Sequence, residues 1–126
     1  MTKHEAAKKR KAAREFEVFK RECDRWIRYW GLLSWGVKYF HTADDDCDSH
    51  CLLPIDGSRG ASLCLSLEPE NTPQENAFHE VAELLLGRIR ILAMSRTATE
   101  EEIDGAIHEV IETLTNTVYR DVKPKG

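Results

Sequence analysis

Apolar side chains recur at spacings of three and four residues in three stretches of the chain, which predicts three amphipathic helices. The first covers about residues 3–30, the second begins at Thr72 and the third at Thr99. Each of the two later helices opens with a Thr followed three residues on by a Glu, the capping-box pattern. The three apolar stripes are Phe16, Phe19, Cys23, Trp26, Ile27 and Trp30; Phe78, Val81, Ala82, Leu85, Ile89 and Leu92; and Ile103, Ile107, Val110, Ile111, Leu114 and Val118.

Between the first two helices the apolar residues alternate with polar ones, which is typical of strands. Segments 33–41 and 61–67 show this pattern, and the second is the clearer because its leucines share one face. The short apolar run 51–55 between them is also interpreted as a strand. Acidic and glycine-containing turn sequences separate the segments. We therefore predict an α+β fold with a long N-terminal helix, a small three-stranded antiparallel sheet, an HExx-helix and a second C-terminal helix.

The composition fits one small domain. The chain has 126 residues, 41% of them hydrophobic, and a net charge of −4. We assign residues 15–120 to a single metal-binding domain, 1–14 to a basic N-terminal extension that is solvated and frayed, and 121–126 to a polar tail. The acidic balance argues against nucleic acid as a partner.

Neither a signal-peptide core nor an apolar stretch of about 18 residues is present in the sequence. We therefore expect a cytoplasmic protein with no membrane partner. In that reducing compartment the four cysteines are expected to be free thiols.

The second helix carries the residues with the clearest chemistry, in the sequence His79-Glu80-Val81-Ala82-Glu83. Side chains four residues apart project from the same helix face, so His79 and Glu83 can bind one ion together. The third helix offers His108. Measured from the centre of each stripe at about 100° per residue, His79 and Glu83 lie roughly 100° and 140° away, and His108 roughly 100°. The three side chains therefore share the boundary at which two packed helices meet.

Imidazole and carboxylate groups suit zinc, and three protein ligands leave a fourth position for water. We predict a zinc site formed by His79, Glu83 and His108. Glu80, next to the first ligand, lies where a metallohydrolase has its general base, and it would activate the metal-bound water. A small helix rotation would exchange His108 for Glu109 or Glu112, so the last ligand stays open.

The order of elements resembles a minimal zincin metallopeptidase of the gluzincin or SprT-like kind, and more closely the short metallopeptidase-like proteins of phage and prophage genomes. The matching stretches are Trp30–Val37, His79–Leu86 and Glu101–Leu114. The resemblance implies a peptidase in the host cytoplasm, with a peptide or protein substrate along the strand 61–67. The chain departs from the zincin pattern at Glu83, where a zincin has His.

Two other functions fit the sequence. Glu80-x-x-Glu83 and Glu109-x-x-Glu112 resemble the paired acidic motifs of MazG-type nucleotide pyrophosphatases, which are all-helical and bind magnesium. A non-catalytic interaction or inhibitor protein on the same fold would not need Glu80. A separate zinc site built from histidines and cysteines of residues 41–64 is less favoured, because it lacks a second closely spaced pair of ligands.

Overall fold

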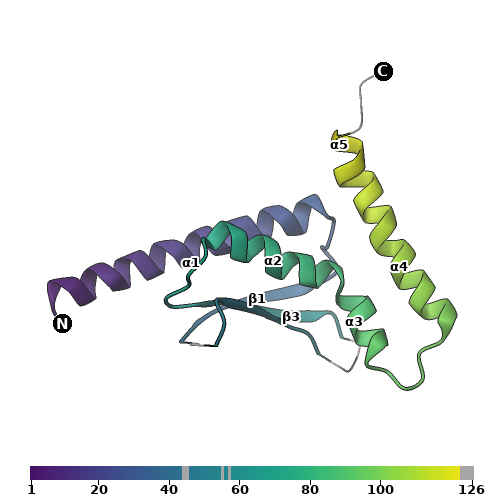
Figure 1. Ribbon diagram of the computed structural model, residues 1–126, viewed down its shortest axis with the longest axis horizontal. Helices are drawn as coiled ribbons and strands as arrows, with labels where there is room; N and C mark the ends of the chain where they lie inside the picture. Colours follow the sequence, from purple (N-terminus) through teal and green to yellow (C-terminus); the bar gives the residue numbers. More distant parts are fainter. Residues whose placement is uncertain (44–45, 55, 57, 123–126) are drawn as a thin grey trace.

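The computed structural model describes residues 1–122 except 44, 45, 55 and 57. A long N-terminal helix leads into three strands, and helices make up the rest of the chain (Figure 1). The elements are α1 (Lys3–Tyr29), β1 (Gly36–Thr42), β2 (Ser49–Leu52), β3 (Gly60–Ser66), α2 (Pro73–Leu85), α3 (Gly87–Ala93), α4 (Glu100–Leu114), the π-helical turn η1 (Thr115–Tyr119) and α5 (Arg120–Val122). The α+β prediction is confirmed.

The sheet is mixed, so the prediction of an antiparallel sheet was wrong. Its strand order is β1-β3-β2, with β1 parallel to β3 and β2 antiparallel to β3. A parallel pair needs a crossover of a dozen or more residues, and residues 43–59, which include β2, supply it. The most apolar strand takes the central position, where Leu63 and Leu65 are fully buried. Strands β1 and β2 are the two edges.

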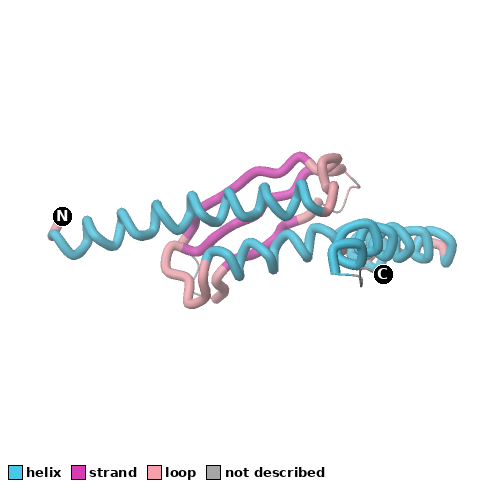
Figure 2. Tube along the Cα trace, turned by 90° about the horizontal axis from the view of Figure 1, so that it is seen from above, coloured by secondary structure: helices cyan, strands magenta, loops and turns pink. Residues whose placement is uncertain are grey.

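Helices α1 and α2 lie side by side on one face of the sheet, as the two views show (Figures 1 and 2). Between the helices and the sheet lies one hydrophobic core, built from Phe19, Cys23, Ile27, Trp30, Trp35, Cys51, Ala61, Leu63, Leu65, Ala77, Val81 and Leu84. Alternation in β1 places every second residue toward this core. The predicted stripe of α1 is thereby confirmed at Phe19, Cys23, Ile27 and Trp30.

The basic N-terminal segment continues α1 without a break. Thr2 caps the helix in a capping box with Glu5, so α1 is helical from Lys3 onward. Residues 8–11 are solvent-exposed and lie within this helix. No helix in the described part of the chain combines the length and the apolar character that crossing a membrane requires.

The predicted second helix ends earlier than its pattern suggested. Its stripe was expected to run to Leu92, but α2 ends at Leu85 and α3 starts at Gly87. The chain approaches the core closely at that point: a Cβ on Gly87 would lie 2.8 Å from Leu53 Cδ1 and 3.3 Å from Trp35. The interruption of the helix thus coincides with a glycine that packs closely against residues of the core.

The C-terminal segments α4, η1 and α5 form one continuous helix that projects from the rest of the molecule (Figure 1). Its first half packs against α3, and Tyr29 of α1 donates a hydrogen bond to Asp121 near its end. Ala106 is the only buried residue of α4. Most of the third apolar stripe is therefore exposed, with Ile103 and Val110 half-buried.

Candidate metal centre

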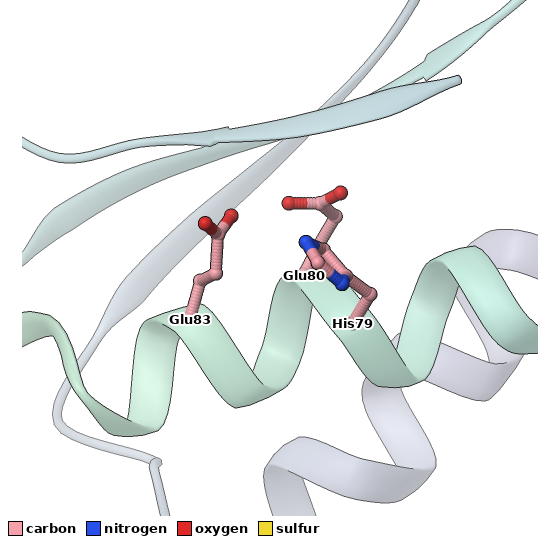
Figure 3. A group of neighbouring side chains, drawn as sticks. All are labelled: His79, Glu80 and Glu83. Atoms are coloured by element: carbon pink, nitrogen blue, oxygen red, sulfur yellow. The ribbon is translucent and has the colours of Figure 1, made fainter. Parts of the chain in front are cut away.

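Three side chains of α2 converge on one point beside the sheet. His79, Glu80 and Glu83 each offer one ligand atom, and these atoms all lie within 4.8 Å of one another. Figure 3 shows the imidazole and the two carboxyl groups on the same side of the helix, between α2 and the strands. The cap at Thr72 and the proline at the first helical position fix where α2 begins, and thus which residues face the sheet.

Glu80 is the most buried of the three, with a relative exposure of 1%. Its Oε2 is hydrogen-bonded to the Ser49 hydroxyl of β2, and the same hydroxyl lies 2.9 Å from Asn76 Oδ1. A hydroxyl has one hydrogen, so Ser49 can donate to only one of these oxygens at a time. The Asn76 side chain continues this network toward Asp48. Glu80 is therefore held directly by Ser49 of the sheet, and Asn76 of its own helix contacts the same hydroxyl.

The second oxygen of Glu80 is buried with no donor facing it among the described residues. The adjacent acid is Glu83, another carboxyl. Burial, and then the neighbouring Glu83 carboxyl, raise the pKa of Glu80 to about 8, while the hydrogen bond from Ser49 acts in the opposite direction. Two carboxyl groups that face each other require either a shared proton or a bound cation.

The group is accessible from one side. A cavity of about 340 Å³ adjoins it, lined by residues of the loop before β2 and of α2, including Ser49, Asn76, His79 and Glu80. His79 is exposed and Glu83 is half-buried. The arrangement thus has a buried acid at its base, an exposed imidazole at its rim, and room beside them for a small molecule or part of a chain.

His108 lies on α4, outside this group. Its Nδ1 lies 2.8 Å from the carbonyl oxygen of Asp104 on its own helix. Glu109 forms an ion pair with Arg88 of α3, and Glu112 is solvent-exposed. The structure therefore brings together two of the three predicted ligands and the predicted base, and leaves the ligand predicted on the other helix apart from them.

The alternative site of histidines and cysteines is not assembled. Cys51 and Cys64 are buried in the sheet, whereas Cys47 is exposed. Cys47 lies 3.8 Å from His50, but among the described residues these side chains do not join a group of three ligands. Burial, together with Glu80 and Glu83, raises the pKa of the Cys51 thiol to about 12. Cys51 is therefore a neutral core residue next to the site.

Two residues that hold the site were missed from the sequence. Asn76 is four residues before Glu80 on the same helix face, and this spacing is the one signal in the sequence that points to it. Ser49 comes from a strand 31 residues away in the chain, and no local pattern marks it. Only the packing of β2 against α2 identifies Ser49 as a partner of Glu80.

Comparisons of the chain with family models, curated proteins and solved structures find no match. The resemblance to zincin-like phage proteins therefore stays a prediction from the sequence.

Proposed function

We propose that the group on α2 binds a zinc ion and that the protein is a zinc-dependent hydrolase. His79 and Glu83 are the ligands in this proposal, and Glu80 is the general base. The observation that carries it is the buried Glu80 oxygen that has no hydrogen-bond donor and lies next to a second carboxyl group. Such a pair is costly to bury without a cation or a proton to compensate it.

The donor set fits zinc in type. One imidazole and one or two carboxylates are ordinary zinc ligands, with bond lengths of about 2.0–2.2 Å. Since the ligand atoms now lie within 4.8 Å of one another, modest side-chain rotations would bring them to those distances. Zinc bound there would act as a Lewis acid toward water and a carbonyl oxygen. With only two ligands from one helix, we expect weaker binding than at a closed four-ligand site.

Glu80 has the features of a general base in this setting. It is buried and fixed by Ser49, and it borders the cavity that a substrate would enter. A nearby cation would lower its pKa again, so that the carboxylate form could take a proton from the attacking water. Ser49 would act as a positioning residue, because its hydroxyl holds one oxygen of Glu80 and leaves the other directed toward Glu83.

A peptide bond is the proposed target, and this part rests on the sequence resemblance alone. The strand 61–67, the expected binding strand for a peptide, corresponds to β3, which is paired on both sides over residues 62–65. That expectation is therefore wrong, since a central strand has no free edge to offer. Strand β2 is the edge strand that contacts α2, and a peptide substrate would pair there.

The rival functions differ in how well they agree with the fold. MazG-type pyrophosphatases are all-helical, whereas this chain contains a three-stranded sheet. A non-catalytic interaction protein agrees with the fold equally well. The network around Glu80 favours the hydrolase, because a surface that only binds a partner gains nothing from a buried acid with an unpaired oxygen.

The test is zinc content by mass spectrometry on protein purified without chelator or affinity tag. We expect about one zinc per chain in the wild type and loss of zinc in His79→Ala. His4→Ala, which removes a histidine from the first turn of α1, is the matched control and should retain the metal. No zinc in the wild type, together with an unchanged melting temperature on adding zinc, would refute the proposal.

His108→Ala decides the ligand set in the same experiment. Retention of zinc would show that α2 alone supplies the protein ligands. Loss of zinc would show that α4 closes over α2 when the metal binds and that the sequence prediction of three ligands holds.

A further inference from the structure

The C-terminal helix carries a continuous apolar stripe that the described part of the chain leaves exposed. Ile107, Ile111, Leu114 and Val118 have relative exposures of 38%, 52%, 37% and 40%. Ile103 and Val110 are half-buried at the edge of the same stripe. Exposed apolar surface that runs along a whole helix is unusual in a monomer and marks an interaction surface. These six residues are called the α4 stripe below.

The neighbouring side of α4 already packs on the body of the molecule. Ala106 and Thr113 border a small cavity with Trp30 and Leu84, and Glu109 pairs with Arg88. Val110, at the edge of the α4 stripe, borders the same cavity. The contacts with the body of the molecule thus fix which side of α4 faces outward. The α4 stripe lies beside this packed side, so a partner can reach it without displacing α4 from α3.

The spacing between successive residues of the α4 stripe is the same whether the sequence is followed forwards or backwards. Successive members are separated by four, three, one, three and four residues. In an antiparallel pair of identical helices, Ile103 would therefore lie opposite Val118, Ile107 opposite Leu114, and Val110 opposite Ile111. A twofold interface requires this kind of self-complementarity, whereas binding to a different protein does not.

The charges agree with the same arrangement. Glu100, Glu101 and Glu102 occupy the first turn of α4, and Arg120 lies near the other end of the continuous helix. An antiparallel pair brings the acidic first turn of one copy toward Arg120 of the other. It also places the opposed ends of the two helix dipoles side by side, which a parallel pair does not.

We propose that the α4 stripe is the interface of a homodimer in which two copies of α4 pack antiparallel about a twofold axis near Val110 and Ile111. The wild-type protein is then a dimer whose formation depends on concentration. The interface is independent of the candidate metal centre, because the α2 group is formed within one chain.

Sedimentation velocity over a concentration series, from micromolar to sub-millimolar, tests the dimer. Ile111→Glu adds a charge to an exposed position, so the variant should fold, with an unchanged circular dichroism spectrum, and remain monomeric. Leu33→Glu is the matched control, since Leu33 is 72% exposed and lies outside α4; this variant should dimerise like the wild type. A wild type that stays monomeric at the highest concentration, or an Ile111→Glu variant that dimerises normally, overturns the proposal.

Disulfide trapping tests the antiparallel register. The background is Cys47→Ser, since Cys47 is the exposed cysteine of the four. In the proposed register Ile111 lies beside its own copy at the axis, whereas Val118 lies opposite Ile103. Ile111→Cys should therefore give a covalent dimer on mild oxidation and Val118→Cys should not. Equal cross-linking of the two variants would mean a parallel pair and would overturn the arrangement.

Discussion

Helices α2 and α4 carry nearly the same sequence pattern with very different results. Both begin with a Thr cap, and both contain a His-Glu-Val-x-Glu run, at His79 in α2 and at His108 in α4. In α2 the first Glu of the run is buried, and the three polar side chains converge. In α4 the corresponding residues, His108, Glu109 and Glu112, are exposed and do not share a partner.

Tertiary packing explains the difference. Helix α2 packs against both α1 and the sheet, so Glu80 in its His-Glu-Val-x-Glu run is buried and meets Ser49 of β2 and the neighbouring Glu83 carboxyl. The first half of α4 packs against α3. The polar side chains of its His-Glu-Val-x-Glu run stay in contact with water, where a carboxylate needs no partner. This five-residue pattern therefore becomes a candidate metal centre only where the fold removes it from water.

The largest difference between α2 and α4 is expected in the rate of catalysis after the matched Glu→Gln substitution in each helix. In the zinc-loaded protein Glu80→Gln should lower peptide hydrolysis by about 10²–10⁴-fold, the usual contribution of a general base, while zinc content stays the same. Glu109→Gln, the matched change in α4, should leave the rate unchanged. Measurement requires a fluorogenic peptide library. Equal rates for wild type and Glu80→Gln would remove Glu80 from the mechanism and favour a protein that only binds.

Burial of leucines gives the next largest contrast. Leu84→Ala in α2 should lower the free energy of unfolding by about 2–5 kcal/mol, because Leu84 is 1% exposed and its removal leaves a cavity. Leu114→Ala in α4, where the leucine is 37% exposed, should cost less than about 1 kcal/mol at concentrations below dimerisation. Urea denaturation measures both. Similar losses at the two positions would mean that α4 packs on the core in solution.

The pH dependence of stability should reveal the buried acid of α2. The pKa of Glu80 is raised from its ordinary value to about 8, so between about pH 4.5 and 8 the native metal-free protein binds a proton that the unfolded chain has lost. The free energy of unfolding contributed by Glu80 is therefore fully present at the acidic end of this window. It falls as the pH rises, by at most about 1.4 kcal/mol per pH unit.

Urea titrations in chelator from pH 5 to 8 measure this slope. Glu80→Gln should flatten it, whereas Glu109→Gln in α4 should leave it as in the wild type. A wild-type stability that rises across the window would contradict the assignment of a neutral Glu80 in the metal-free protein.

The smallest contrast concerns the partners of the two glutamates. Ser49→Ala removes the hydroxyl that holds Glu80 and should destabilise the metal-free protein by about 1–3 kcal/mol, since a buried oxygen loses its partner. Arg88→Ala breaks the exposed pair with Glu109 and should cost about 0–1 kcal/mol. Thermal unfolding compares them. A larger effect for Arg88→Ala than for Ser49→Ala would reverse the ranking of the two environments.

Much of the local structure could be predicted because it depends on nearby residues. The caps at Thr72 and Thr99 mark helix starts in the structure where the sequence placed them. Alternation likewise located β1 and β3 to within a few residues. The end of α2 could not be predicted, because the close approach of Gly87 to Trp35 and Leu53 depends on residues far away in the chain.

The sequence by itself determined the helices, the strands, and the adjacency of His79 and Glu83 on one helix face, since all of these follow from short-range periodicity and capping. Tertiary structure alone decided that β3 is central, that Ser49 meets Glu80, and that His108 lies apart from the metal centre. It also decided that the apolar stripe of α1 is largely buried, whereas the apolar stripe of α4 is largely exposed. These outcomes depend on which surfaces lose water when distant segments pack, and a local pattern carries no information about its distant neighbours.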